Sequence, residues 1–291
     1  MQTQSSFQGK YDTGTLYIVP TPIGNLEDIT LRAIRILKES DLIAAEDTRN
    51  TRKLLNHLEI DTPLTSYHEH NKLTKDASLI DKLRTGMSIA LVSDAGMPGI
   101  SDPGYELVQG VLAADIAVVV LPGANAALCA LVGSGLSTDE FYFYGFLPRK
   151  KRQKEEELNR LKSIQASLLF YESPHRLVET LEALYEHLGD RNVTLARELT
   201  KRFEEYVRGS LTETIIWAKQ SEIRGEFCIV VEGAKEAEQK EQAEWWLPLS
   251  IKQHVNHHIE GYGLSSKEAI KVVAEERKLP KRDVYQAYHV E

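Results

Sequence analysis

Short apolar runs alternate with amphipathic segments from residue 15 to residue 121 of this chain. The segments between the runs repeat apolar residues at helical spacing, as in LRAIRILKE at 31–39 and YELVQGVLA at 105–113. The runs themselves have the length of strands and lie at 15–19, 41–45, 63–67, 88–93 and 116–121. Strands that alternate with helices predict a parallel sheet covered by helices on both faces.

A second α/β unit follows and orders its elements differently. Helical spacing is found in HRLVETLEALYEHL and TETIIWAKQ, and strand-like runs lie at 168–172, 193–198, 205–210 and 227–233. Two of these runs follow each other without a helix between them, which predicts a hairpin and a mixed sheet. The expected fold is therefore two α/β domains, with a parallel-rich sheet in 14–123 and a mixed sheet in 124–233.

The rest of the chain predicts smaller parts. Residues 1–13 are polar and are expected to form a disordered tail. Residues 234–244 carry many charges and no aliphatic side chain larger than alanine, which is typical of a linker. Residues 245–291 predict a small helical domain of helix-turn-helix type, in which Ser265 and Glu268 form a capping box.

Composition excludes several classes of protein. The longest aliphatic run, 116–121, is far shorter than the ~20 residues that span a bilayer, and the polar N-terminal residues lack the pattern of a secretion signal. We therefore expect a cytoplasmic protein without membrane segments. Cys129 and Cys228 have no CxxC spacing and are expected to be buried thiols. The net charge of −8 means that a nucleic-acid partner would need a local basic patch.

The loops that follow the predicted strands are rich in special residues. Asp94–Gly104, DAGMPGISDPG, contains three glycines, two prolines and two aspartates, so it cannot continue a sheet. Ligands of open α/β sheets bind outside the carboxyl ends of the strands. Neither GxxxxGK[ST] nor a GxGxxG after the first strand is present, which argues against a P-loop or a nicotinamide-binding enzyme. Glycines with little basic charge suit a flat, uncharged or zwitterionic ligand held by backbone groups.

Eight segments together resemble one family. They are PTPIGNLEDITLRA, AAEDTRNT, SYHEHN, LVSDAGMPGISDPG, LPGANAALCALVGSGL, FLPRK, FYESPHR and ARELTK. In this order, over about residues 14–233, they look like the class III, tetrapyrrole-methylase-type methyltransferases. They are most similar to the branch that methylates the 2′-hydroxyl of a cytidine ribose in small-subunit ribosomal RNA.

The resemblance implies that S-adenosylmethionine binds in the cleft between the two α/β domains of a homodimer. Asp102 and Pro103 would fix the loop and the start of the next helix rather than touch the ligand. The residues that the resemblance implies as cofactor contacts are Pro22, Asp94, Ala95, Gly96, Pro98, Gly99, Ile100, Ser101, Ser134, Tyr171, Ala196, Gly225, Glu226 and Phe227.

Methyl transfer from a sulfonium mainly requires the nucleophile to be held in line, and it needs no metal. A ribose hydroxyl is weakly acidic, so a general base or a polarising cation would help. Candidates at strand ends are Glu46, Asp47, His68 and Lys201, although the two acids could equally cap the following helix. His254 and His258 share a helix face, but no third metal ligand is evident and a solvated helix is favoured.

The segment RKKRQK, Arg149–Lys154, carries five positive charges and opens a predicted helix. Cations in a first helical turn oppose the helix dipole, so local stability does not explain them, whereas phosphate contact does. The alternative is a solvated linker balanced by the glutamates at 155–157. The predicted RNA contacts are Arg49, Arg52, Arg149, Lys150, Lys151, Arg152, Lys154 and Arg176, with His175 beside them.

The expected activity is S-adenosylmethionine-dependent 2′-O-methylation of a cytidine ribose in small-subunit ribosomal RNA, either free or in the subunit. Two alternatives stay open: methylation of a tetrapyrrole ring carbon, and a non-enzymatic RNA-binding protein that uses the C-terminal helices. The helical residues 267–291 hold six Lys and Arg against five Asp and Glu, so packing or dimer contact explains them as well as RNA does.

Overall fold

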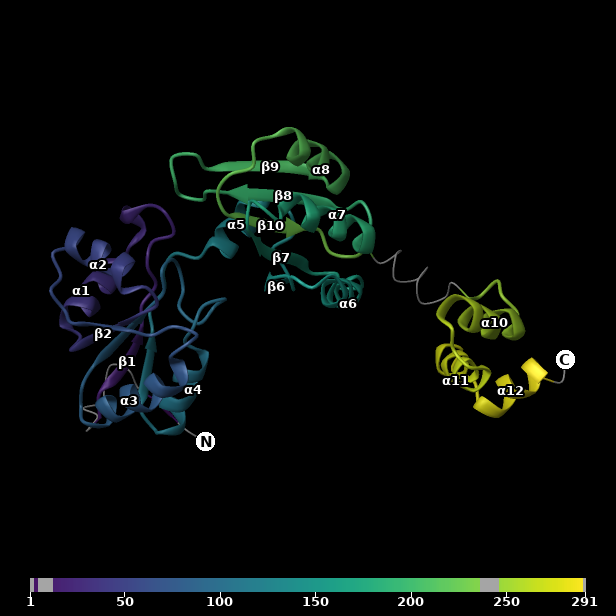
Figure 1. Ribbon diagram of the computed structural model, residues 1–291, viewed down its shortest axis with the longest axis horizontal. Coiled ribbons are helices and arrows are strands. Elements are labelled where there is room, and N and C mark those ends of the chain that lie inside the picture. Colours follow the sequence, from purple (N-terminus) through teal and green to yellow (C-terminus); the bar gives the residue numbers. More distant parts are fainter. Residues whose placement is uncertain (1–2, 5–12, 236–245, 290–291) are drawn as a thin grey trace. The chain divides into compact units, whose positions relative to one another are not determined.

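The computed structural model describes residues 3–4, 13–235 and 246–289. The chain divides into two compact units, one made of residues 1–161 and 166–232 and the other of 162–165 and 233–291 (Figure 1). Most of the tail expected at 1–13 and nearly all of the linker expected at 234–244 lie outside the described residues. Within that tail, the side-chain amide of Gln4 exchanges two hydrogen bonds of 2.9 Å with the backbone of Val118.

The first sheet of the larger unit has five parallel strands in the order β3-β2-β4-β1-β5. The predicted strands are confirmed to within two residues at each end. Every residue of the central strand β4 is buried, as expected for a strand with helices on both of its faces. The strands are β1 (Thr15–Ile18), β2 (Leu42–Ala45), β3 (Leu64–Ser66), β4 (Ile89–Val92) and β5 (Ala117–Val120).

Helices cover both faces of this sheet, as Figure 1 shows. One apolar core joins α1 and α2 to the sheet around Val19, Leu37 and Leu55, and a second joins α3 and α4 around Leu79 and Leu107. The helices are η1 (Leu26–Asp28), α1 (Leu31–Glu39), α2 (Thr48–His57), α3 (Lys72–Arg84) and α4 (Tyr105–Ala113).

The second sheet of the larger unit is mixed, as predicted, with the order β6-β7-β10-β8-β9. β6 runs parallel to β7, and the remaining neighbours are antiparallel. The strands are β6 (Phe141–Phe146), β7 (Ser167–Glu172), β8 (Asn192–Arg197), β9 (Glu205–Ser210) and β10 (Phe227–Val231). The sequence pattern does not predict β6, whose register shifts between Phe143 and Gly145 and breaks the regular alternation of a strand.

Four helices of the described residues complete the larger unit: α5 (Ala126–Ser134), α6 (Lys151–Leu161), α7 (Leu177–Leu188) and α8 (Leu211–Gln220). α5 is made of small and apolar residues and packs on one face of the second sheet, where Ala130 and Leu131 meet Leu169 and Val230. The basic segment opens α6, as predicted. A capping box of Ser210 and Glu213 begins α8.

The smaller unit contains α10 (Ile251–Tyr262), α11 (Ser266–Glu276) and α12 (Lys281–His289). Its core is made by Val255, Ile270, Val273 and Val284. The predicted capping box of Ser265 and Glu268 is present.

The two cysteines differ in exposure. Cys228 is a buried free thiol, as expected, whereas Cys129 is exposed and corrects the expectation for that residue. None of the helices in the described part of the chain is long and apolar enough to span a bilayer.

Candidate active site

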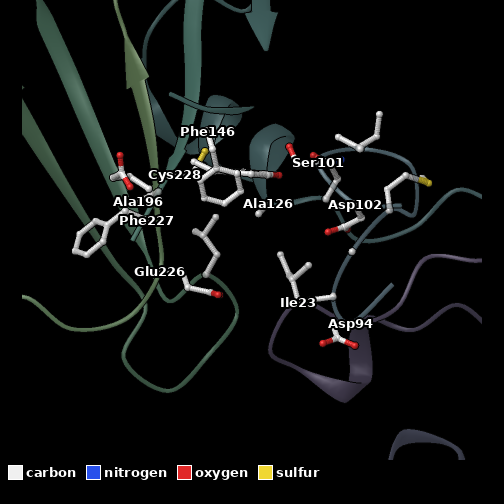
Figure 2. A pocket seen from close by; sticks show the side chains of 18 of the residues that line it. Ile23, Asp94, Ser101, Asp102, Ala126, Phe146, Ala196, Glu226, Phe227 and Cys228 are labelled. Carbon is white, nitrogen blue, oxygen red and sulfur yellow. The ribbon is translucent and has the colours of Figure 1, made fainter. Parts of the chain in front are cut away.

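A cavity of about 330 Å³ opens in the larger unit where the loops of the two sheets meet. The first sheet contributes loops that follow the carboxyl ends of β1, β2 and β4. The second sheet contributes the carboxyl ends of β6, β7 and β8 and the start of the antiparallel β10. These strand termini all lie at the same end of that sheet. The lining residues, most of them drawn in Figure 2, include Ile23, Glu46, Asp94–Met97, Ile100–Asp102, Asn125, Ala126, Phe146, Tyr171–Ser173, Ala196, Glu198, Leu199, Lys201 and Glu226–Cys228.

The loop after β4 forms one wall of this cavity because hydrogen bonds tie it to the loop after β1. Thr21 and Gly96 exchange backbone hydrogen bonds of 2.9 and 3.0 Å, and the Thr21 hydroxyl donates to the carbonyl of Ser93 at 3.1 Å. Gly96 has a φ of +80°, which favours glycine. A Cβ on Gly104 would lie 2.9 Å from Leu91, so glycine also allows this loop to pack on the sheet.

The opposite wall contains an aromatic cluster around Tyr171. The Tyr171 ring contacts the rings of Phe143 and Phe146, with centroid distances of 5.1 and 5.6 Å. Burial raises the pKa of the Tyr171 hydroxyl to about 12, so the residue stays neutral. A wall of this kind suits a nucleoside or another planar ligand.

Charge in the cavity is strongly negative. The lining contains one lysine, Lys201, and six carboxylates, on Glu46, Asp94, Asp102, Glu172, Glu198 and Glu226. The lysine is paired, because its Nζ lies 2.9 Å from Glu198 Oε1. Such a lining is complementary to a cationic or zwitterionic ligand and opposes a polyanion.

Glu46, Asp94 and Asp102 follow β2 and β4, and the pKa values of Glu46 and Asp102 are raised. Burial and then the charge of Glu46 raise the pKa of Asp102 to about 7. Burial and then the charge of Asp94 raise the pKa of Glu46. Asp94 itself accepts hydrogen bonds of 3.1 Å from the backbone of Asp47 and from Asn50.

The structure separates the predicted cofactor residues into two groups. Those that line the cavity are Asp94, Ala95, Gly96, Ile100, Ser101, Tyr171, Ala196, Glu226 and Phe227, and those that do not are Pro22, Pro98, Gly99, Ser134 and Gly225. The hydroxyl of Ser134 is turned to its own helix and donates to the carbonyl of Leu131 at 2.7 Å.

The four candidate general bases separate in the same way. Glu46 and Lys201 line the cavity, whereas Asp47 and His68 do not. Asp47 caps α2, and hydrogen bonds from Arg49 lower its pKa to about 2, so it is a weak proton acceptor. The His68 amide donates to the Asn71 side chain, and this loop precedes α3.

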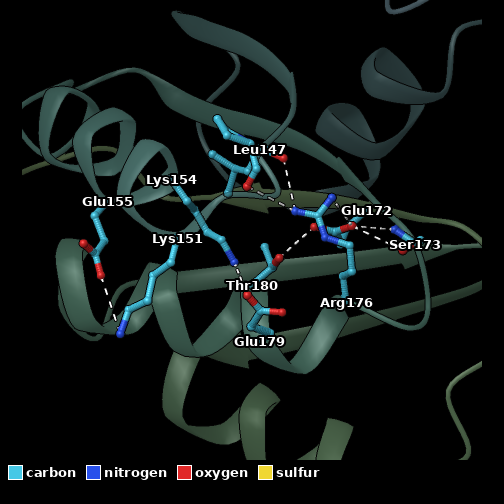
Figure 3. Close-up of polar contacts among 10 residues, drawn as sticks. Leu147, Lys151, Lys154, Glu155, Glu172, Ser173, Arg176, Glu179 and Thr180 are labelled. Carbon is cyan, nitrogen blue, oxygen red and sulfur yellow. Dashed lines mark hydrogen bonds and ion pairs between the residues drawn. The ribbon is translucent and has the colours of Figure 1, made fainter.

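The predicted RNA contacts differ in exposure. Arg49, Arg52 and the segment 149–152 are exposed, with Lys151 and Arg152 one turn from Glu155 and Glu156. Lys154 is buried instead: its side chain is 4% exposed and its Nζ lies 2.6 Å from Glu179 (Figure 3). Its ammonium is therefore committed to the protein.

Arg176 is half-buried and holds the loop before the basic segment. Its guanidinium donates to the carbonyls of Leu147 and Pro148, at 3.1 and 3.4 Å, and lies 3.7 Å from Glu172 (Figure 3). This arginine positions the segment 149–152, whatever else it contacts.

Several residues of the cavity are not evident from the sequence. The sequence assigns Asp102 to fixing the loop, but Asp102 lines the cavity, as do Ile23, Ala126, Phe146 and Glu198. The position of Asp102 inside the glycine-rich loop is the available signal. The sequence does not reveal that Glu46 lies near Asp102, because Glu46 follows β2 and Asp102 follows β4.

The expectation for the C-terminal histidines also needs correction. His254 and His258 are buried rather than solvated, and a third possible ligand exists, because Glu276 of α11 lies 2.8 and 2.9 Å from their Nε2 atoms. The spacing of His254 and His258 within α10 cannot reveal Glu276, because this residue belongs to α11. Arg277 Nε donates to His254 Nδ1 at 3.1 Å, which leaves the proton on Nε2, toward Glu276. This arrangement favours a buried hydrogen-bond network over a metal site.

Comparison with known proteins agrees with this fold. The family model of the tetrapyrrole (corrin/porphyrin) methylases matches residues 15–215, and the chain belongs to this family of methyltransferases. It is 58% identical to the ribosomal RNA small subunit methyltransferase I of Halalkalibacterium halodurans, over all of both chains. It is 56% identical to that of Bacillus subtilis, over 100% of this chain and 99% of the relative.

A solved structure shares the fold at low identity. It is the uroporphyrin-III C-methyltransferase of Thermus thermophilus complexed with S-adenosylhomocysteine, with a TM-score of 0.54 and 20% identity over 75% of this chain and 97% of the other. At this identity the likeness concerns the fold alone.

Proposed function

We propose that this protein transfers a methyl group from S-adenosylmethionine to the 2′-hydroxyl of a cytidine ribose in small-subunit ribosomal RNA. The full-length similarity to relatives named as ribosomal RNA small subunit methyltransferases supports small-subunit ribosomal RNA as the substrate class. The nucleotide and the ribose position rest on the motifs of the sequence.

The cavity fits the proposed cofactor by charge and by shape. When bound, S-adenosylmethionine supplies an electrophilic methyl group on a sulfonium. The six lining carboxylates are complementary to that cation and to an α-ammonium group. Gly96 lines the cavity without a side chain of its own, and the Tyr171 wall offers an apolar face to a nucleoside.

The residues of the cavity would promote the reaction mainly by orientation. Methyl transfer needs the attacking oxygen in line with the carbon–sulfur bond, and walls from two sheets can hold two ligands in fixed relation. The apolar side chains of Ile23, Phe146 and Phe227 exclude water that would compete as nucleophile.

RNA would contact the exposed cations of residues 149–152 together with Arg49 and Arg52. Their charges are not required for helix stability, and their exposed side chains can reach phosphates. The ion pairs of Lys151 and Arg152 lie on the surface, where such pairs contribute little and exchange readily. Lys154 is left out of this proposed surface, because Glu179 holds it.

Two finer features belong to the same proposal. We place the protein in the cytoplasm, with ribosomal RNA, and we propose a homodimer. α5 exposes Leu128 and Val132, with 47% and 76% of their surfaces accessible, and an apolar pair of this kind on a helix favours burial against a second copy. Light scattering of the purified chain tests the dimer.

The decisive experiment uses a radiolabelled methyl donor with three acceptors: assembled small subunits, free small-subunit RNA and a uroporphyrin-type tetrapyrrole. We expect label in RNA and an alkali-resistant bond at the labelled nucleotide, because a 2′-O-methyl group removes the nucleophile of alkaline cleavage. Label in the tetrapyrrole alone would replace this function by ring methylation. RNA binding without any methyl transfer would leave a non-enzymatic role.

The RNA surface has its own test. Reversing Lys150, Lys151 and Arg152 to Glu should lower the slope of log affinity against log salt by about 0.7–0.9 for each phosphate that the variant no longer neutralises. The matched control reverses Lys38, Lys82 and Arg84, which are exposed elsewhere on the same unit and change the net charge equally. Equal slopes for both variants would remove the surface from the proposal.

A further inference from the structure

The loop between β8 and β9 presents an exposed aromatic ring beside the cavity. Phe203 has 69% of its surface accessible, and the guanidinium carbon of Arg202 lies 5.6 Å from the centre of its ring. Figure 1 shows this loop beyond the ends of the two strands that it joins. Neither residue lines the cavity, but both directly follow Lys201, which does. A single exposed apolar side chain is common on protein surfaces, so the surroundings of this ring decide its meaning.

The first half of the loop is docked on the loop that follows β1. Leu199 is 6% exposed and belongs to an apolar core against which Ile23 packs. A Cβ on Gly24 would lie 2.3 Å from Lys201 Cγ, so glycine allows this close approach. Thr200 has a φ of +65°, which a non-glycine residue keeps only where surrounding packing maintains it. The tip of the loop therefore has a defined position.

Polar contacts within the loop engage its other charged residues. The Lys201 ammonium lies 2.9 Å from Glu198, and Glu204 accepts a 2.7 Å hydrogen bond from the Thr200 amide. Among the described residues, no acidic side chain forms an ion pair with Arg202, which is exposed. Because six carboxylates line the cavity, a phosphate beside a bound nucleotide would need a cation outside it. Arg202 can supply that charge.

A nucleotide that enters the cavity leaves its neighbour in the strand without a stacking partner. Proteins that bind unstacked RNA cover such base faces with aromatic side chains or with the plane of an arginine. Phe203 follows Lys201 by two residues, so the Cα atoms of the two residues are at most about 7 Å apart. That span is comparable to the separation of neighbouring bases in an unstacked strand. The ring is therefore within reach of the base next to the one in the cavity.

We propose that Phe203 is a stacking platform for the base that adjoins the methylated nucleotide, and that Arg202 contacts a phosphate of the same strand. This inference rests on the proposed function. The cation–π contact with Arg202 holds the ring in place before RNA binds, which reduces the entropy lost on binding. The platform favours single-stranded RNA, because a base inside a duplex keeps both faces stacked.

The first test measures methyl transfer by Phe203→Leu, which keeps an apolar side chain but has no ring. We expect kcat/KM for the RNA acceptor to fall about 5- to 150-fold, the usual contribution of one base stacked on an aromatic side chain. Phe203→Trp keeps a ring and should retain the wild-type value. The matched control is Phe141→Leu, because Phe141 is 46% exposed and begins β6, at the end remote from the cavity-lining Phe146. Equal values for the two leucine variants would refute the platform.

Calorimetry distinguishes RNA contact from support of the cavity. Phe203 does not line the cavity, so titration with S-adenosylhomocysteine should give the wild-type affinity for Phe203→Leu. An affinity that falls as far as kcat/KM does would overturn the proposal, since the ring would then act by maintaining the cofactor site.

RNA binding is measured without methyl transfer on a single-stranded oligonucleotide and on the same strand paired with its complement. Phe203→Leu should weaken binding to the single strand and leave binding to the duplex unchanged. Equal weakening on both would show that the ring does not stack on a base, and the proposal would be wrong.

Salt dependence tests the phosphate contact of Arg202. Arg202→Gln should lower the slope of log affinity for the single strand against log salt by about 0.7, the value for one phosphate. Phe203→Leu should keep the wild-type slope, because stacking releases no counterion. The control is Arg84→Gln, which removes an exposed arginine of α3 and changes the net charge equally. Equal slopes for the two glutamine variants would remove Arg202 from the proposal.

The two proposals fail separately. Absence of ribose methylation by the wild-type protein on any RNA acceptor would refute the proposed function. Ribose methylation by the wild-type protein that Phe203→Leu performs equally well would refute the platform alone.

Discussion

Replacing Thr180 by valine tests the polar network beneath the cavity. The carboxylate of Glu172, at the end of β7, has 1% of its side chain exposed and accepts a 2.7 Å hydrogen bond from the Thr180 hydroxyl (Figure 3). Thr180 lies in α7 and is fully buried. Valine has the shape of threonine without its donor, so the change removes one hydrogen bond and leaves no cavity.

The magnitude follows from the charge of the acceptor. A hydrogen bond to a buried charged group contributes about 1.5–3 kcal/mol. Glu172 keeps a 2.8 Å hydrogen bond from the amide of Ser173 and has Arg176 at 3.7 Å, so its charge is not left wholly without partners. We therefore expect the free energy of unfolding to fall by about 2 kcal/mol, within that range.

Thr214→Val is the matched control. Thr214 is equally buried and also helical, but its hydroxyl donates to neutral carbonyls of Ser210 and Leu211, at 3.0 and 3.1 Å. Neutral hydrogen bonds contribute about 0.5–1.5 kcal/mol, and the propensity change from Thr to Val in a helix is common to both variants.

Native-state hydrogen exchange on the full chain measures both variants in the same elements. The slowest amides of β7 and β10 report the opening of the second sheet. We expect protection to fall about fivefold further in Thr180→Val than in Thr214→Val, which corresponds to about 1 kcal/mol. Equal decreases would show that the charge of Glu172 adds nothing to this hydrogen bond, and the reasoning would be wrong.

Three further changes have defined outcomes. Ala126→Leu adds three carbons at a residue that lines the cavity, and since alanine and leucine both favour a helix, α5 should be retained. Calorimetry should therefore show weaker binding of S-adenosylhomocysteine. Val132→Leu, on the exposed side of the same helix, should leave this affinity unchanged. Lys154→Met should leave RNA affinity and its salt slope intact, because Glu179 already holds the ammonium; a reduced slope would place it on the RNA surface. Burial lowers the pKa of His254, so the stability that the neutral ring contributes is complete above the unfolded-state pKa of about 6.5 and is lost as the pH falls through the folded-state pKa. Hydrogen exchange of the α10 amides should therefore accelerate on acidification. Exchange that does not depend on pH in this way would contradict the expectation.

Local pattern predicts most of the fold. In the described part of the chain, nine of the ten strands follow from apolar runs, because burial on one or two faces imposes a period that any window of the chain displays. β6 does not, since FYFYGF has a register shift near Gly145 and leads directly into a proline-containing loop. Its aromatic enrichment is the signal that could have found it.

Lys154 is misplaced by the sequence reasoning although a signal is present. It shares a helical face with the buried Leu158 and Leu161, at the spacing of one and two turns. The neighbouring cations favour a phosphate contact for Lys154, but its position on the buried face of α6 places its side chain inside the protein. Burial of its aliphatic stem and the pairing with Glu179 are the physical reason.

The sequence by itself determined the strand–loop–helix order, the glycine-rich wall and the family, because these depend on residues close together in the chain. Tertiary structure alone decided which ionisable groups meet. The charge of Glu46, which follows β2, helps to raise the pKa of Asp102, which follows β4. Glu276 of α11 pairs with His254 and His258 of α10. In both cases the interacting residues are remote in sequence. Coulomb energy and desolvation depend on distance and burial in space, and no local pattern encodes either quantity.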